Sequence, residues 1–263
     1  MLNEEGFNMA YEHIEVEVKD RVGTITLNRP PVNVLNIAMM SEINDALKKF
    51  LDDNELVAVL FKAKGKCFSA GVDVGEHMGD MAPKMIEVFH GMFRLLHKFE
   101  IPTVASVFSS CLGGGCELAT FCDIVIASEN AKIGQPEIQV GVFPPIAAQI
   151  FPRIIGRKAA MDLILTGRVI SAQEALSIGL VNKVVKDDEL EAETEKFVDQ
   201  FRKLSPVVIR KTKKAIMMGL MENFEDSLKI IEEIYLDELM KTEDAEEGLK
   251  SFLEKRKPVW KNK

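Results

Sequence analysis

The sequence predicts an α/β fold with parallel strands, followed by a helical C-terminal region. Two observations lead to this prediction. Segments with strand and helix periodicity alternate between residues 13 and 127, as in sheets whose parallel strands are joined by right-handed crossovers. Beyond residue 145 the periodicity is almost entirely helical. With 263 residues, 47% of them apolar and 28% charged, the chain can bury the core of one large domain.

The N-terminal half supplies most of the predicted strands. Residues 13–18 alternate between apolar and polar, and residues 22–27 follow a short turn, so these two segments form a hairpin. Asn28-Arg29-Pro30-Pro31 ends the second strand. The following elements are an amphipathic helix over 37–51, a buried strand over 56–61, a helix over 81–98, and strands over 102–107 and 123–127.

Two loops that contain glycine follow two of the predicted buried strands. Loop 64–73 comes after the strand over 56–61, and the stretch 108–115 comes after the strand over 102–107. Ligands of parallel sheets bind outside the carboxyl ends of the strands. Both loops are therefore predicted to border a ligand site.

The C-terminal part is predicted to be a series of helices with clear end signals. Gly167 ends a helix over 158–166, and Ser171 and Glu174 form a capping box that opens the next one. Residues 180–185 are extended, and Pro206 and Pro258 mark breaks. The remaining predicted helices cover 188–203, 206–221, 224–241 and 243–255.

The run from Cys111 to Thr120 combines three glycines with an acidic residue at the start of an apolar segment. If a helix begins there, its first amides have no partner within the helix and carry the positive end of its dipole. Such amides can hold negative charge that develops on a substrate oxygen, with Glu117 close to that charge. A glycine turn that packs a buried helix, with Glu117 beside the dipole, explains the stretch equally well.

Charge and cysteine usage exclude several classes of function. The net charge of -8 gives little support for nucleic-acid binding, and no apolar run reaches the length of a membrane span. The basic run Arg210-Lys211-x-Lys213-Lys214 is interpreted as a solvated helix face. The four cysteines form no CxxC pair and no metal-ligand pattern with the histidines, so we expect reduced, mostly buried thiols and no metal site. These thiols and the lack of a secretory signal indicate a cytoplasmic protein.

Several motifs, taken together and in order, resemble the signature of the crotonase (enoyl-CoA hydratase/isomerase) superfamily. They are Cys67-Phe68-Ser69-Ala70-Gly71-Val72-Asp73, Leu112-Gly113-Gly114-Gly115-Cys116-Glu117-Leu118, Gly134-Gln135-Pro136-Glu137, and Leu165-Thr166-Gly167 with Ser171-Ala172-x-Glu174-Ala175. The similarity covers roughly residues 10 to 260. It implies a ββα spiral core over 10–200 and a C-terminal helical trimerisation region over 201–263. It further implies an acyl-CoA thioester substrate and a homotrimer or hexamer.

Further segments are similar to family members that hydrate cyclohexa-1,5-diene-1-carbonyl-CoA. These are Val74-Gly75-Glu76-His77-Met78, Gly141-Val142-Phe143-Pro144, and the ending from Tyr235 to Arg256. The resemblance implies water addition that gives 6-hydroxycyclohex-1-ene-1-carbonyl-CoA, without metal or redox cofactor, because coenzyme A enters as part of the substrate. The alternatives are a general enoyl-CoA hydratase of β-oxidation type and a non-catalytic CoA-binding or RNA-binding paralogue.

The resemblance also assigns site residues by motif position. The backbone amides of Val72 and Gly114 would hold the thioester oxygen. Glu117 and Glu137 fall on the two catalytic glutamates of the family. Glu117 would position and activate water, and Glu137 would deliver the proton. Because hydration needs a base and an acid, a carboxylate pair with tuned pKa values can supply both.

Substrate contacts follow from the same comparison. The candidates for CoA binding are Ala70, Asp73, Val74, Lys66 and, reaching a neighbouring subunit, Lys255. The candidates for the acyl pocket are His77, Met78 and Phe143. The chain departs from the straight-chain hydratase pattern after Pro144, where Pro145-Ile146-Ala147-Ala148 replaces a glycine-rich run. This departure predicts an acyl pocket of different shape, compatible with a ring.

Overall fold

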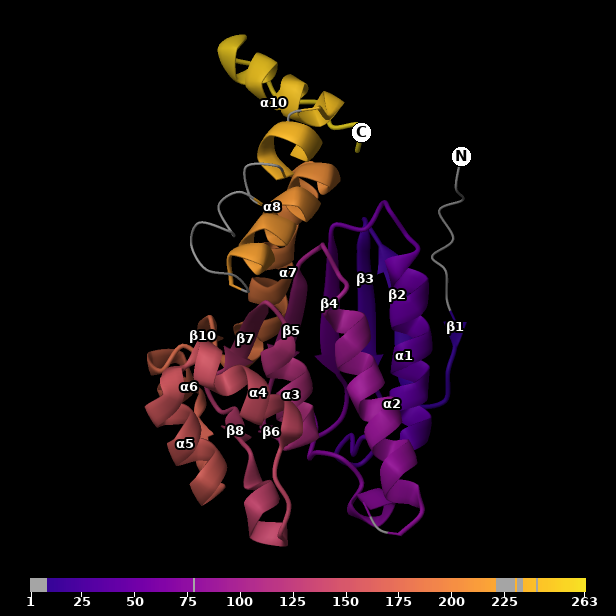
Figure 1. The fold of residues 1–263 in the computed structure, drawn as a ribbon, viewed down its shortest axis with the longest axis vertical. Helices are drawn as coiled ribbons and strands as arrows, with labels where there is room; N and C mark the ends of the chain where they lie inside the picture. Colours follow the sequence, from indigo (N-terminus) through magenta and orange to yellow (C-terminus); the bar gives the residue numbers. More distant parts are fainter. Residues whose placement is uncertain (1–8, 78, 221–229, 231–233, 240) are drawn as a thin grey trace.

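The protein, seen in a computed structural model that describes residues 9–77, 79–220, 230, 234–239 and 241–263, is a mixed α/β fold (Figure 1). The larger sheet contains, from edge to edge, β1 (Met9–Ala10), β2 (Ile14–Lys19), β3 (Val22–Leu27), β4 (Ala58–Ala63), β5 (Thr103–Val107), β7 (Ile124–Ser128) and β10 (Lys183–Val185). β2 and β3 form the predicted antiparallel hairpin, and β3, β4, β5, β7 and β10 run parallel. The predicted parallel α/β architecture is confirmed.

A second, smaller sheet was not predicted. It consists of β6 (Ser110–Leu112), β8 (Lys132–Gly134) and β9 (Val169–Ser171), which are too short to show a periodicity. β6 leads into α3 (Gly114–Phe121), and β8 leads into the 3-10 helix η2 (Pro136–Val140). Because Leu112 pairs with Gly134, this sheet brings the segments that carry Glu117 and Glu137 side by side.

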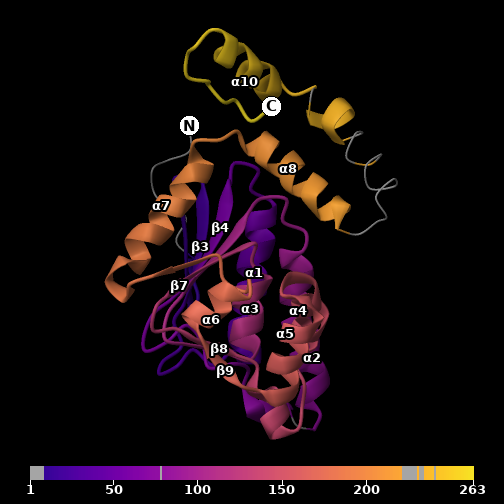
Figure 2. The same ribbon diagram turned by 90° about the vertical axis from the view of Figure 1, so that its left-hand side faces the viewer.

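Helices cover both faces of the large sheet. The main core packs α1 (Ile37–Leu51), α2 (Met81–Leu96) and α3 against one face, to which Val59 and Phe61 of β4 contribute. Ala58 and Leu60 point to the other face, where they meet α7 (Leu190–Arg202) and α8 (Pro206–Gly219) (Figure 2). The remaining helices are α4 (Pro145–Ile154), α5 (Gly156–Thr166), α6 (Ala172–Ser177), α10 (Glu243–Leu253), the 3-10 helices η1 (Val74–His77) and η3 (Asp187–Glu189), and the π-helical turn η4 (Ile234–Leu239).

Local end signals account for the helices that were predicted well. Asn36 caps α1 by accepting the Met39 amide at 3.0 Å, and Ser171 caps α6 by accepting the Glu174 amide at 3.1 Å. Gly167 ends α5 in the left-handed conformation. The helix α4 was not predicted. It starts directly after Pro144, and Pro145 is its first residue. The helix predicted over 224–241 lies largely outside the described residues.

The basic run on α8 corrects a prediction. Its lysines do not form a solvated face but make partly buried ion pairs: Lys213 with Asp123 at 2.5 Å, and Lys211 and Lys214 with Glu238 at 2.6 Å each. These pairs hold α8 to β7 and to η4. The run is therefore structural.

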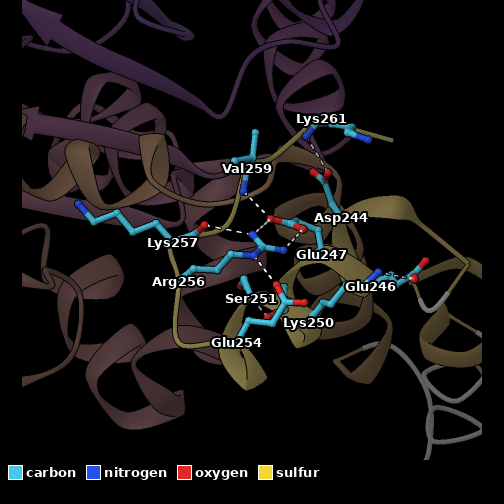
Figure 3. A network of polar contacts seen from close by, with 11 residues as sticks. Asp244, Glu246, Glu247, Lys250, Ser251, Glu254, Arg256, Lys257, Val259 and Lys261 are labelled. Carbon is cyan, nitrogen blue, oxygen red and sulfur yellow. Dashed lines mark hydrogen bonds and ion pairs between the residues drawn. The ribbon is translucent and has the colours of Figure 1, made fainter.

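The C-terminal helix α10 lies at the end of the molecule opposite β6 and β8 in both views (Figures 1 and 2). The tail after it folds back onto α10, where Glu247 binds Arg256 and the Val259 amide (Figure 3). The predicted domain boundary at residue 200 falls inside α7, which packs on the large sheet, and the division itself stays a prediction. Among the described residues, no helix has both the length and the apolar character needed to cross a membrane.

Candidate active site

The turn between β6 and α3 presents bare backbone at the centre of the site. Gly113 has φ 52°, which glycine adopts without steric cost, and Gly114 is the first residue of α3. A Cβ on Gly113 would lie 2.7 Å from Glu137 Oε1, and one on Gly114 would collide with Val72 Cγ2. Only glycines let the Glu137 carboxyl and the Val72 loop approach this turn.

The loop after β4 packs directly against that turn. Ser69 N donates to Ser110 O at 3.1 Å, and Leu112 N donates to Ser69 O at 3.0 Å. Within the described part of the chain, neither the Val72 amide nor the Gly114 amide donates a hydrogen bond. The structure thus brings the two predicted oxyanion donors onto adjoining loops, with both N–H groups free.

Glu117 lies in the first turn of α3 and is only 2% exposed. Its Oε1 accepts the amides of Ile146 and Ala147, both at 2.8 Å, which are among the free amides at the start of α4. Burial raises the pKa of Glu117 to about 8, the charge of Glu137 adds to this, and the two amides act in the opposite direction. A buried carboxyl held in this way is poised to change protonation near neutral pH.

Glu137 is the second residue of η2 and is partly open to solvent. Burial raises its pKa to about 7. Gly113 lies so close to the carboxyl group of Glu137 that a Cβ at Gly113 would be 2.7 Å from its Oε1. The two glutamates predicted from the motifs therefore lie on either side of one glycine turn, close enough for the charge of Glu137 to raise the pKa of Glu117.

Gln135 takes part in the site, although the sequence reasoning gave it no role. It is fully buried, and with its amide nitrogen facing the available acceptors it donates to Glu137 Oε1 and Oε2 at 3.2 Å each and to Gly113 O at 3.3 Å. It therefore joins the Glu137 carboxyl to the peptide whose N–H belongs to Gly114. The available signal was a glutamine next to the Pro136 that opens η2, two residues before Glu137.

Together these groups can stabilise one negatively charged oxygen and can transfer one proton. The free amides can stabilise charge on an oxygen, and two carboxyls with pKa values raised to about 8 and about 7 share a proton between these pH values. One group can then accept a proton while the other donates one.

The candidates for CoA binding fall on the segment from Lys66 to the start of η1 and on the tail after α10. Ala70, Lys66 and Val74 are exposed, and Lys66 has no ion partner among the described residues, whereas Lys64 pairs with Glu15 at 2.6 Å. Asp73 accepts the Gly75 amide at 2.9 Å and so also shapes the start of η1. Lys255 is exposed and comes two residues after the end of α10, the helix that lies at the other end of the molecule (Figure 1). No contact here tests these assignments, which stay predictions.

The acyl-pocket candidates are less closely grouped. His77 is half-buried, and its Nδ1 donates to Asp73 O at 2.8 Å, so the ring caps η1. Phe143 is 65% exposed in the segment between η2 and α4. Met78 lies outside the described residues. All four cysteines are free and buried, as predicted, and burial raises the pKa of Cys67 and Cys122.

Comparison with known proteins agrees with this geometry. The family profile described as enoyl-CoA hydratase/isomerase matches residues 17–263. A probable enoyl-CoA hydratase of Mycobacterium tuberculosis is 40% identical over 254 residues, covering 95% of this chain and 98% of the relative. Cyclohexa-1,5-dienecarbonyl-CoA hydratase of Thauera aromatica is 37% identical over 239 residues, covering 91% of this chain and 92% of the relative.

Solved structures agree as well. The crystal structure of enoyl-CoA hydratase from Bacillus anthracis superposes with a TM-score of 0.91 at 31% identity, covering 96% of this chain and all of that one. This likeness extends the predicted crotonase-type fold over nearly the whole molecule. The profile, the relatives and the fold together show that the chain is an enzyme of the enoyl-CoA hydratase/isomerase family.

Proposed function

We propose that this protein adds water to cyclohexa-1,5-diene-1-carbonyl-CoA and forms 6-hydroxycyclohex-1-ene-1-carbonyl-CoA. The observation that carries the proposal is the pair of glutamates, one buried and one partly buried, on either side of the Gly113–Gly114 turn, with pKa values raised to about 8 and about 7. Water addition needs this combination, because a proton leaves water while another reaches carbon.

In the proposed reaction the thioester oxygen sits between the Val72 and Gly114 amides. Charge that develops on this oxygen as water adds to a conjugated thioester would be stabilised there, and each donor is worth about 3–4 kcal/mol in comparable sites. Following the motif assignment, Glu117 in its ionised form holds and deprotonates the water, while the two α4 amides on its Oε1 oppose the burial that raises its pKa. Glu137 then delivers the proton to carbon.

The cyclic substrate is supported by the segment that follows Glu137. Phe143 is exposed at the approach to α4, and Pro145, Ala147 and Ala148 stand where the straight-chain hydratase pattern has glycines. Larger side chains at these positions narrow a linear channel, and an exposed aromatic ring can pack against a flat ring. The relative from Thauera aromatica, named for this substrate, is consistent with the proposal.

A general enoyl-CoA hydratase is the second candidate, because a relative with that name is equally similar. Purified enzyme assayed side by side with the cyclic dienoyl-CoA and with crotonyl-CoA distinguishes the two. We expect the higher kcat/KM with the cyclic thioester. Faster turnover of crotonyl-CoA would overturn the specific substrate, and turnover of neither would favour a non-catalytic CoA-binding protein.

The proposal includes a cytoplasmic, trimer-based assembly in which Lys255 of one chain approaches the CoA phosphates held by another. Lys255 is exposed and follows α10, which lies at the opposite end of the molecule from β8, so a neighbouring chain would bring it to the phosphates. The reaction changes no oxidation state overall and so needs no redox cofactor, and the proposal includes no metal because the Val72 and Gly114 amides would stabilise the charge on the thioester oxygen.

A further inference from the structure

The segment between Pro31 and α1 is bound along its length to the loop that carries Val72. Ala70 N donates to Val32 O at 3.0 Å, Ser69 Oγ donates to Asn33 O at 2.7 Å, and Leu35 N donates to Gly71 O at 2.8 Å. Asp73 N completes the pairing by donating to Leu35 O at 2.9 Å. No motif in the sequence pointed to this segment.

Asn33 lies at the centre of these contacts. Its side chain is 1% exposed, and its Nδ2 donates to Lys64 O at 2.8 Å and to Cys67 O at 2.9 Å. Its Oδ1 accepts the Arg29 amide at 2.8 Å. The residue has φ 51°, a conformation that asparagine adopts more readily than most side chains. One buried amide thus fixes both ends of the stretch 64–67 and the turn that precedes α1.

We infer that Asn33 is a positioning residue that aims the Val72 amide at the thioester oxygen. This inference rests on the proposed function, in which the Val72 N–H is one of two oxyanion donors. Asn33 does not contact the substrate. It acts through the loop, and its effect is on the direction of one peptide.

The path from Asn33 to that peptide is short. The Gly71 carbonyl and the Val72 N–H belong to the same planar peptide, and Leu35 N holds the carbonyl end at 2.8 Å. Ser69 Oγ, bound to Asn33 O, also accepts the Gly71 amide at 3.2 Å. With the carbonyl pinned in this way, the N–H on the opposite side of the planar peptide points away from Leu35, and Val72 and Gly71 lie against the Gly114 turn.

Small displacements of such a donor are costly. A misplacement of about 1 Å can reduce a rate about 100-fold, because the donor must meet charge that exists only in the transition state. Loss of the two Asn33 donor bonds would free the stretch 64–67, and with it the loop that carries Val72. The expected consequence is a lower kcat with a smaller change in KM.

Two substitutions at Asn33 test this inference. Asn33→Asp keeps the size and the bond from Arg29 but places a carboxylate against two carbonyl oxygens. Asn33→Gly keeps the left-handed backbone and removes the side chain. Asn36→Asp is the matched control, since Asn36 only caps α1 and aspartate caps equally well.

The readouts are kcat, KM and the absorption of bound cinnamoyl-CoA, whose conjugated carbonyl shifts to the red when amides polarise its oxygen. In the wild type and in Asn36→Asp we expect the red shift and full activity. In both Asn33 variants we expect the shift to be lost and kcat to fall about 100-fold. Folded Asn33 variants that keep the shift and kcat would overturn the inference.

If the Asn33 variants do not fold, Ser69→Ala decides, because it removes one hydroxyl from the same path. We expect a weaker red shift and a kcat about 10-fold lower in Ser69→Ala, because only the hydrogen bonds of one hydroxyl are lost. An unchanged shift and an unchanged kcat would contradict the inference. A wild type that binds cinnamoyl-CoA without any shift would instead contradict the proposed oxyanion site, and with it the proposed function.

Discussion

Glu117 and Glu137 are buried to different degrees and have different hydrogen-bond partners. Glu117 Oε1 accepts two main-chain amides, whereas the oxygens of Glu137 face the side-chain amide of Gln135. Oε1 of Glu117 is thereby fixed as an acceptor, so a proton that this group exchanges must pass through Oε2. Glu137 is more open and can hand a proton to a substrate carbon.

The pH dependence of kcat/KM should reflect the proton shared by this pair. Burial raises the pKa values to about 8 and about 7, so we expect a bell-shaped profile with its maximum between these values. At lower pH both carboxyls are protonated and no base is left, and at higher pH both are ionised and no acid is left. Initial rates with the dienoyl thioester measure the profile, and a flat profile from about pH 5.5 to 9.5 would contradict the shared proton.

Glu117 should also reduce the stability of the folded protein at alkaline pH. Its folded pKa of about 8 lies above the ordinary 4.5, so the unfolded chain ionises first and the folding cost grows between these values. We expect Glu117→Gln to raise the free energy of unfolding by roughly 3–5 kcal/mol at pH 8 and to leave it unchanged at pH 4. Urea unfolding at fixed protein concentration measures the difference, which should rise with pH. A difference that is constant with pH would show that Glu117 is not desolvated.

Motif position singled out both glutamates and the amides of Val72 and Gly114, because these groups lie at fixed places next to glycines or Pro136. The structure brings them together, and their roles stay predictions. It could not predict Gln135, Asn33 or the amides of Ile146 and Ala147 as parts of the site. Their roles depend on partners 2 to 34 residues away, and hydrogen bonds of this kind leave no periodic trace in the sequence.

At the scale of elements, the site depends on the close contact between the loop 67–73 and the turn before α3. Gly71, Gly113 and Gly114 lie in this contact, where a Cβ on Gly114 would also meet Phe89 at 3.1 Å. The small sheet supports the same arrangement, because the pairing of Leu112 with Gly134 aligns α3 with η2.

Gly114→Ala should therefore disturb both packing and catalysis. The added methyl group collides with Val72 Cγ2, and such overpacking costs about 1–3 kcal/mol, while the displaced amide lowers kcat about 100-fold. A second substitution, Val72→Ala, should restore part of the stability and part of kcat, because it removes the clashing methyl group. It keeps the main-chain N–H, which is the group of Val72 that the proposed reaction uses. Thermal unfolding and kcat of the single and double variants measure this.

Gly75→Ala is the control for that pair, because its Cβ would meet only Asp73 Oδ1 at 3.2 Å and Gly75 is exposed. It should leave stability and kcat near the wild-type values. If Gly114→Ala behaves like this control, the close contact between the loops is not needed for the reaction.

Elements with strong periodicity or caps were predictable, and short ones were not. Residues 37–51 form the predicted helix between the same two ends, because a capping asparagine precedes an amphipathic pattern. Strands of three residues and the helix α4, which opens with Pro145 and contains Pro152, give no such signal. Their conformation is set by the segments that they pack against.

At the scale of the whole molecule, the C-terminal tail ties α10 to the core. Asp244, 1% exposed, accepts a hydrogen bond from the Lys261 amide at 2.7 Å (Figure 3). It also accepts Ser205 Oγ at 2.5 Å and the Asn262 amide at 3.0 Å. Asn262 in turn donates to Asn54 O at 3.0 Å. The tail thus bridges from α10 to the loop after α1.

Removal of the Asp244 carboxylate should loosen this region. Asp244→Ala leaves three donors without their acceptor, and we expect a loss of about 2–4 kcal/mol, or about 5–10 °C in Tm. Glu243→Ala is the matched control, because Glu243 makes only an exposed pair with Lys261 at 3.2 Å. Thermal unfolding compares them, and equal Tm values would show that the tail is not fastened through Asp244.

The global arrangement was predictable in its order of strands and helices but not in how the C-terminal region is attached. The sequence indicated helices after residue 186, yet the attachment runs through single polar residues such as Asp244, Lys213 and Asn262, whose partners lie 39 to 208 residues away. Composition predicts that such residues are exposed, and only the fold reveals which of them are buried.

The most direct test of the proposed chemistry is to measure kcat for hydration of the cyclic dienoyl-CoA by the wild type, Glu117→Gln and Glu137→Gln. Calorimetry on each protein measures binding of the product thioester. We predict that each glutamine variant loses about 100-fold or more in kcat while CoA thioester binding is kept, because one proton position is removed without loss of shape. Near-normal kcat in either variant would contradict the account, since that carboxyl would then have no part in the reaction.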